Sequence, residues 1–176
     1  MTYKTHILTS MIFGESFLLV SEYQINDNYM GVFVFFFFLI FSSILPDIDE
    51  KKSKISQILP GPIVKLFNLL DHRGFTHNIF GFIFMSFLAY IIIELTVPNY
   101  SVIAIKAFVI GYLSHIFGDM VTYSGVYFIP GFKTRIPIFN NFIVGSYQEL
   151  KVYFLLTWIQ IGIILFGFYS FRFGGF

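Results

Sequence analysis

The chain has 176 residues, a formal net charge of +1 and a charged-residue content of only 12%, whereas 56% of its residues are hydrophobic. A soluble globular domain carries about 25% charged residues, so these are too few to cover a water-exposed surface, and a single integral-membrane domain over residues 1–176 is expected. The near-neutral charge argues against nucleic acid as a partner, and the absence of cysteine excludes disulfides and cysteine-ligated zinc.

Five apolar segments follow one another along the chain. They cover residues 7–20, 29–45, 79–97, 102–123 and 152–168. The first is short for a bilayer span, which needs about 20 residues. The other four are long enough to favour helices over buried strands. The sequence therefore predicts an all-α, polytopic membrane helical bundle of about five apolar helices.

The loops between these segments differ in charge. Loops 46–78 and 124–151 carry lysine and arginine, whereas loops 21–28 and 98–101 carry neither. The positive-inside rule places the two basic loops and the N-terminus in the cytoplasm. Glu15 interrupts the first apolar segment and no cleavage site follows it, so the N-terminus is expected to be retained. Residues 62–70 favour a short helix, either at the membrane surface or in an ordinary loop.

Histidine and aspartate lie at the cytoplasmic ends of the expected helices. Because the chain has no cysteine, any metal site must use histidine and carboxylate ligands. The candidate ligands are His6, Asp47, Asp49, His72, His77, His115 and Asp119. The orientation of the chain in the membrane rests on lysine and arginine alone. The location of the histidine and aspartate candidates on one side is therefore an independent argument for a metal site at the cytoplasmic end. Each residue taken alone has a plainer interpretation, as a buried core histidine or a solvated helix end.

The local spacings suit coordination. His115 and Asp119 are four residues apart, so they share a helix face at about 5–6 Å. Asp47 and Asp49 follow Pro46, where an extended stretch would point alternate side chains the same way. His77 is expected in the first helical turn, with Thr76 as its N-cap.

The number of candidate ligands exceeds what one ion needs. A catalytic zinc takes about three protein ligands and keeps a position for water, so seven candidates suit one or two ions, and two ions can share a carboxylate. A mixture of histidine and aspartate suits zinc best, with manganese or iron as alternatives.

Four motifs resemble those of the YdjM-like membrane-bound metal-dependent hydrolases. They are THILTS at 5–10, LPDIDE at 45–50, HRGFTHN at 72–78 and GYLSHIFGDMVTYSGV at 111–126. The resemblance implies a helical protein of a prokaryotic-type inner membrane with the same seven metal ligands, distantly similar to zinc-dependent phospholipase C and single-strand nucleases. GSYQE at 145–149 resembles a later family motif and adds Glu149 as an eighth candidate, although Gly145 stands where the phospholipases have histidine.

Together these features predict a hydrolase that cleaves a phosphoester with metal-activated water. The expected position of the site, level with the lipid headgroups, favours a lipid-linked or membrane-proximal phosphoester. Asp47 or Asp49 would orient or deprotonate the water, and Arg73 would clamp the anion through its planar guanidinium. Lys133 and Arg135 would attract an anionic headgroup. The alternatives are a transporter for divalent ions or protons and a non-catalytic membrane protein that only binds a metal.

Overall fold

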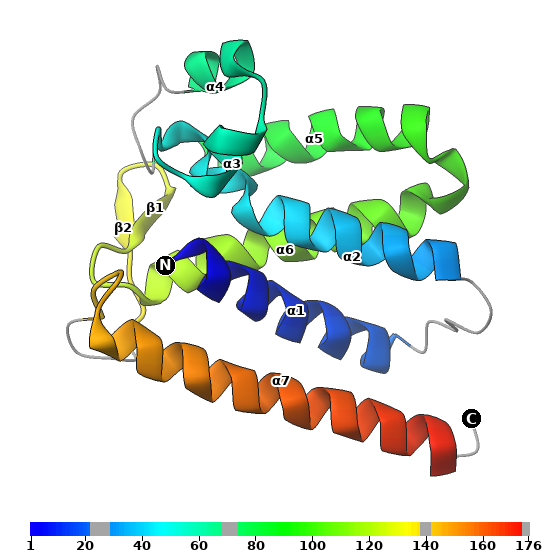
Figure 1. The fold of residues 1–176 in the computed structure, drawn as a ribbon. Helices are drawn as coiled ribbons and strands as arrows, with labels where there is room; N and C mark the ends of the chain where they lie inside the picture. The colour runs from blue at the N-terminus through cyan, green and yellow to red at the C-terminus, as the bar shows by residue number, and fades with distance from the viewer. Residues whose placement is uncertain (22–28, 68–73, 138–141, 174–176) are drawn as a thin grey trace.

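The computed structural model describes residues 1–21, 29–67, 74–137 and 142–173 (Figure 1). Within this part of the chain the long elements are helices that occupy the five apolar segments, so the prediction of an all-α bundle is confirmed. These helices are α1 (Tyr3–Val20), α2 (Tyr29–Ile44), α5 (Ile79–Thr96), α6 (Ser101–Val121) and α7 (Tyr147–Phe173).

Proline and asparagine set the ends of two of these helices. After α2 the chain tightens into a 3₁₀ turn, η1 (Leu45–Asp49), with Pro46 in its first turn. Helix α5 begins after Asn78, whose side-chain oxygen accepts a hydrogen bond from the Gly81 N–H at 2.9 Å. The prediction of Thr76 as the N-cap was wrong, because the helix begins after Asn78. The Thr76 hydroxyl group instead forms a hydrogen bond with Asp49. Pro98 opens the short turn η2 (Pro98–Tyr100), which joins α5 to α6.

Short elements gather at one end of the bundle (Figure 1). They are α3 (Lys54–Ile58), α4 (Gly61–Phe67) and an antiparallel hairpin of β1 (Val126–Ile129) and β2 (Phe132–Thr134). Helix α4 lies in the stretch where a short helix was expected. The hairpin was not expected, although Gly131 in its turn has a φ of +84°, a conformation that favours glycine.

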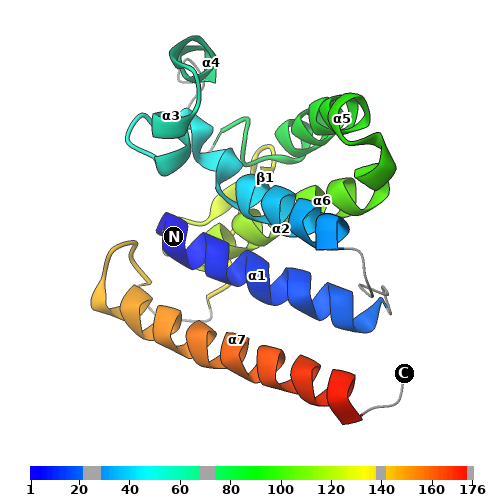
Figure 2. The ribbon, with the colours of Figure 1, turned by 45° about the vertical axis from the view of Figure 1, so that its right-hand side comes forward.

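Helix α6 is the central element of the bundle. It packs against α1, α2 and α5, and buried residues occur along its whole length (Figures 1 and 2). Phe108, Tyr112 and Ile116 lie in its core-facing part with at most 2% of their surface exposed. Helix α7 packs mainly on α1, and most of its surface is left exposed.

Four segments of the described chain are long and apolar enough to cross a membrane. They are Tyr29–Asp49, Ile79–Thr96, Pro98–Val121 and Tyr147–Tyr169. Helix α1 has the same length as α5 but is not among them. Its sequence carries Lys4, His6 and Glu15, which lower its hydropathy, and it runs beside α6 and α7 within the bundle.

The close approach of α2 and α6 depends on Gly111. A Cβ atom at this position would overlap the Ser42 side chain and the Leu39 carbonyl oxygen. Gly111→Ala should therefore lower the stability of the protein by about 1–3 kcal/mol, the usual cost of overpacking. Thermal unfolding in detergent, followed by circular dichroism, measures this change.

Gly162→Ala is the matched control, since nothing lies within 4 Å of a Cβ atom placed on Gly162 in α7. This variant should be neutral or slightly stabilising, because alanine is the better helix former. Equal effects of the two substitutions would contradict the importance of this helix contact.

Candidate metal centre

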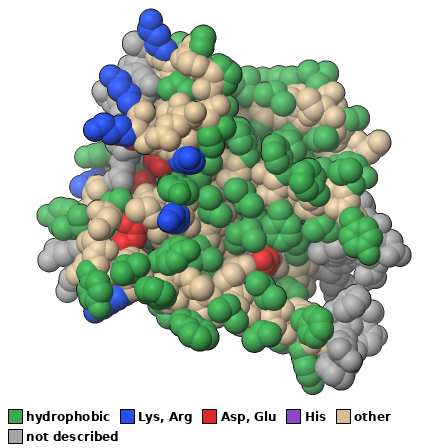
Figure 3. Space-filling view, viewed as in Figure 1, with side chains coloured by type: hydrophobic (Ala, Val, Ile, Leu, Met, Phe, Trp, Pro, Cys, Tyr) green, Lys and Arg blue, Asp and Glu red, His purple; other side chains and the backbone are tan. Residues whose placement is uncertain are grey.

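Charged side chains concentrate at the end of the bundle that carries the short elements. In the view of Figure 3, lysine, arginine and most acidic side chains lie at this end, whereas hydrophobic side chains cover much of the surface over the long helices. The N-termini of α1, α5 and α7 and the C-termini of α2 and α6 all meet here (Figure 1). The polar ends of the helices therefore share one side of the molecule, and the orientation of that side in the membrane stays a prediction.

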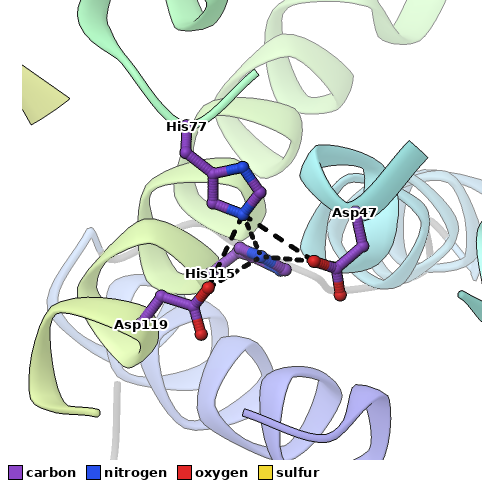
Figure 4. Close-up of side chains that lie close together, drawn as sticks. All are labelled: Asp47, His77, His115 and Asp119. Carbon is purple, nitrogen blue, oxygen red and sulfur yellow. Dashed lines mark hydrogen bonds and ion pairs between the residues drawn. The ribbon is translucent and has the colours of Figure 1, made fainter. Parts of the chain in front are cut away.

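Four side chains converge within this end of the bundle. Asp47 projects from η1, His77 from the segment before α5, and His115 and Asp119 from the last turns of α6 (Figure 4). One ligand atom from each lies within 4.8 Å of the others. The structure thus brings together two imidazoles and two carboxylates from three separate parts of the chain.

Five of the six separations between these four atoms are close to those of a tetrahedral metal site, and the sixth, between the Asp47 and Asp119 oxygens, is at most 4.8 Å. The Nε2 atoms of His77 and His115 are 3.3 Å apart. Asp47 Oδ1 lies 3.7 and 3.6 Å from these two nitrogens, and Asp119 Oδ2 lies 3.5 and 3.9 Å from them. Zinc bonds of about 2.0–2.1 Å would place ligand atoms about 3.4 Å apart. A small inward movement of the side chains would therefore suffice to hold one ion.

The second nitrogen of each imidazole is already engaged, which fixes the direction of its ring. His115 Nδ1 lies 2.7 Å from the Ser43 carbonyl oxygen, to which it donates a hydrogen bond. His77 Nδ1 lies 3.0 Å from the Thr76 hydroxyl oxygen. Both Nε2 atoms are thereby turned toward the centre of the cluster. Partners of this kind orient histidine ligands in metal proteins.

Thr76 connects His77 to Asp49. Its hydroxyl group donates a hydrogen bond to Asp49 Oδ2 at 2.6 Å, and the Tyr112 hydroxyl group holds the Thr76 carbonyl oxygen at 2.6 Å. The approach of this segment to α5 requires Gly81, since a Cβ atom there would overlap the Phe75 carbonyl. The sequence indicated Thr76 only as a helix cap, although its position directly before His77 was a signal for this contact.

Asp49 is placed differently from Asp47. The expectation of an extended stretch was wrong, because both residues lie in a 3₁₀ turn, where alternate side chains do not point the same way. Asp47 enters the four-residue cluster, whereas Asp49 Oδ2 lies 3.7 Å from His77 Nδ1, on the far side of that ring. The structure therefore places Asp49 where it orients His77.

His6 lies against the cluster without entering it. Its ring stacks on His115 with a centroid distance of 3.7 Å, and its Nε2 lies 3.4 Å from Asp119 Oδ1. Both ring nitrogens are buried and have no hydrogen-bond partner among the described residues. The amino group of Met1 also donates to Asp119 Oδ1. One oxygen of Asp119 thus faces the cluster, and the other faces His6.

The charge on His77 follows from its carboxylate neighbours. Burial lowers the pKa of His77, but the nearby carboxylates of Asp119 and Asp49 raise it more, and the resulting pKa is about 9. A metal ion must displace this proton to bind Nε2, so its affinity falls as the pH falls.

Glu149 lies apart from the cluster and accepts three hydrogen bonds. They come from the Thr2 N–H at 2.6 Å, the Thr5 hydroxyl group at 2.9 Å and the Gly145 N–H at 2.7 Å. Glu149 therefore ties the start of α7 to the first turn of α1, next to His6. Of the remaining predicted site residues, His72 and Arg73 lie outside the described residues.

The cluster is accessible mainly through Asp47. The side chains of His77, His115 and Asp119 are at most 1% exposed, whereas that of Asp47 is 21% exposed. After η1 come three exposed lysines, Lys51 and Lys52 in the following turn and Lys54 at the start of α3. The cluster therefore meets solvent on the side of Asp47.

Replacing Thr76 tests the arrangement around His77. Thr76→Val removes the hydroxyl group that links His77 to Asp49 and keeps the side-chain shape, so the affinity for zinc should fall about 10–100-fold. Competition titration with a zinc chelator measures this affinity. Thr76→Ser keeps the hydroxyl group and should bind nearly as well as the wild type, whereas equal affinities for all three proteins would contradict the role of Thr76.

A family of known proteins is similar to this chain over the region that contains its motifs. The family model described as YdjM inner membrane protein matches residues 1–173. The inner membrane protein YdjM of Escherichia coli (strain K12) is 40% identical over 90 residues, which are 49% of this chain and 44% of the relative. The inner membrane protein YdjM of Shigella flexneri matches to the same extent. The match thus spans less than half the length of these relatives, and no solved structure matches. Because the family model covers nearly the whole sequence, the resemblance seen in the motifs is confirmed, and the chain belongs to the YdjM inner membrane protein family.

Proposed function

We propose that this protein is a membrane-bound, metal-dependent hydrolase that cleaves a phosphoester. The proposal rests on the set of two buried imidazole nitrogens and two carboxylate oxygens that lie within 4.8 Å of one another, with Asp47 partly exposed to solvent. Two histidines and two aspartates suit zinc, with manganese or iron as alternatives. A divalent ion held by these residues would lower the pKa of a bound water toward about 7 and so supply a nucleophile.

A second ion would lie beside the first, between His6 and Asp119, where it would displace the Met1 amino group from Asp119 Oδ1. His6 Nε2 and Asp119 Oδ1 face each other at 3.4 Å, and both His6 nitrogens lack a hydrogen-bond partner among the described residues. Asp119 would then bridge the two positions through its two oxygens. Paired ions of this kind stabilise both oxygens of a phosphoryl displacement. This supports a hydrolase that uses one or two ions.

The described residues divide the remaining tasks. Asp47 is the partly exposed member of the cluster, so it is the carboxylate best placed to orient or deprotonate the attacking water. Asp49 acts through Thr76 and His77 as a positioning residue. Glu149 positions α7 against α1 beside His6. Arg73 lies outside the described residues, and its role in binding the phosphate stays a prediction.

The location of the cluster favours a substrate at the bilayer surface. It lies at the end of helices that are long enough to cross a membrane, close to exposed lysines. Lys51, Lys52 and Lys54 follow η1 directly and would attract an anionic group toward Asp47. By the positive-inside rule this end lies in the cytoplasm, so the substrate would be a lipid-linked or membrane-proximal phosphoester on that side.

A non-catalytic metal site is the second candidate, because four protein ligands around one ion are typical of closed, structural zinc sites. A transporter has less support, since transporter sites lie near the middle of the bilayer, whereas this cluster lies at one end of the bundle (Figure 1).

Hydrolysis by the purified protein distinguishes these functions. The protein in detergent, loaded with zinc or manganese, is assayed against a panel of phosphomonoesters and phosphodiesters that includes short-chain phospholipids. At least one ester should be cleaved, and Asp47→Asn should lower kcat at least roughly a hundredfold, because it removes both a ligand and the proposed base.

Glu50→Gln is the control, since Glu50 follows Asp49 and lies outside the cluster. It should retain the wild-type rate. Stoichiometric metal without cleavage of any ester would favour the non-catalytic site, and the absence of bound metal would contradict both functions.

A further inference from the structure

Two polar side chains lie along the apolar part of the bundle, away from the metal centre, and of these Gln160 is buried and Glu15 is partly buried. Glu15 is in α1 and Gln160 is in α7, and both helices begin at the end of the molecule that carries the cluster (Figures 1 and 2). At a rise of 1.5 Å per residue, Glu15 lies about 18 Å along α1 and Gln160 about 20 Å along α7. Both residues therefore lie at the same depth, well within a hydrocarbon layer of about 30 Å.

These two side chains contact each other and leave two acceptor atoms without a partner. The Gln160 amide group lies within interaction distance of the Glu15 carboxyl group, on helices that pack against each other. Glu15 Oε2 and Gln160 Oε1 are both buried and have no hydrogen-bond partner among the described residues. Gln160 is only 8% exposed, so water does not replace the missing partners. An unpaired polar atom is expensive in such surroundings.

The two unpaired oxygen atoms, Glu15 Oε2 and Gln160 Oε1, lack a hydrogen-bond donor. An ionised carboxylate and an amide oxygen are both acceptors, so they cannot bond to each other. A proton on Glu15 Oε2 turns this atom into a hydrogen-bond donor. Gln160 Oε1 can then accept a hydrogen bond from it. The amide N–H group of Gln160 meanwhile donates to the other oxygen of Glu15. A carboxylic acid and an amide can thus exchange two complementary hydrogen bonds.

We propose that Glu15 is a proton-binding site within the bilayer and that its acid proton closes a two-bond pair with Gln160, which fastens α7 to α1. A proton is the ligand that satisfies both orphaned oxygens at once. It also removes a negative charge from the interior of the membrane, where a charged side chain is costly.

The neighbouring helices offer no charge that would favour the ionised form instead. The described Tyr29–Ile44 segment of α2 contains no Asp, Glu, Lys, Arg or His. Lys106 of α6 lies over the Phe17 ring, 5.9 Å from its centroid, and is not in ion-pair contact with Glu15. On α7, Glu149 and Lys151 lie in the first turns, far along the helix from Gln160. Among the described residues, Gln160 is thus the polar partner of Glu15.

A polar contact with α1 is important for the position of α7, because this helix makes few other contacts with the bundle. This helix packs mainly on α1, and only 11% of its span is buried. Apolar contacts do not drive helix association in lipid, whereas polar contacts between helices do contribute. Glu149 ties α7 to α1 at the end near His6, and the Glu15–Gln160 pair ties it at mid-depth. The pair thereby also keeps Glu149 in place beside the metal centre.

Infrared spectroscopy detects the acid proton directly. The protein is purified in a maltoside detergent, which has no carbonyl group, and studied at neutral pH. The wild type should show the C=O stretching band of a protonated carboxylic acid, and Glu15→Gln should lack it. Glu94→Gln, which changes an acid on α5, should retain the band. The absence of any band that depends on Glu15 would overturn the proposal.

Cysteine crosslinking in membranes tests the fastening of the helices. The chain has no cysteine, so a pair introduced by Leu19→Cys and Gly167→Cys reports only on α1 and α7, which approach closely there. Glu15→Leu or Gln160→Leu should lower the rate of disulfide formation roughly threefold, as expected for one interhelical polar contact. Glu15→Gln keeps two complementary hydrogen bonds and should retain the rate.

Size-exclusion elution in detergent confirms that each variant is folded before it is compared. An unchanged rate in both leucine variants would overturn the fastening role, even if the acid band is present. Neither measurement depends on metal binding or hydrolysis, so failure of this proposal and failure of the proposed function can be told apart.

Discussion

The structure depends most on the burial of two carboxylates beside two imidazoles at one end of a membrane bundle. Asp47 and Asp119 lie within 4 Å of both His77 and His115. Like charges this close repel one another, and buried charges are costly unless they are paired. In the metal-free protein a proton on His77 offsets part of this charge, as its raised pKa of about 9 indicates. A divalent cation would offset more of it and would also satisfy both imidazole nitrogens.

The fold supplies this site by placing the ends of its helices side by side. Helix α6 runs through the middle of the bundle and carries His115 and Asp119 in its last turns. The tight 3₁₀ turn after α2 and the segment before α5 bring Asp47 and His77 to the same depth. Because a membrane excludes unsatisfied polar groups from its interior, such helix ends are where polar chemistry is least costly. The Glu15–Gln160 pair is an exception, because its polar atoms lie away from the helix ends. The proposed proton on Glu15 would allow both side chains to be paired there.

The long helices could be predicted from the sequence because uninterrupted apolar runs have few other stable structures in a membrane. The shared face of His115 and Asp119 could also be predicted, since their spacing depends only on helix geometry. The different positions of Asp47 and Asp49 could not, because they depend on a 3₁₀ turn whose direction is set by packing against other helices. The bond between Thr76 and Asp49 joins residues 27 positions apart, and no local pattern indicates such a contact.

Binding of a divalent metal ion by the buried His–Asp cluster is the property on which the proposed chemistry depends. X-ray absorption spectroscopy at the zinc edge of the purified, zinc-loaded protein tests it most directly, because it reports the ligand atoms around the ion. We expect about one or two ions per chain, bound by imidazole nitrogen and carboxylate oxygen at about 2.0–2.2 Å. His115→Ala should reduce both the imidazole signal and the bound metal. A protein that binds no stoichiometric metal, or binds it without imidazole ligands, would contradict the account.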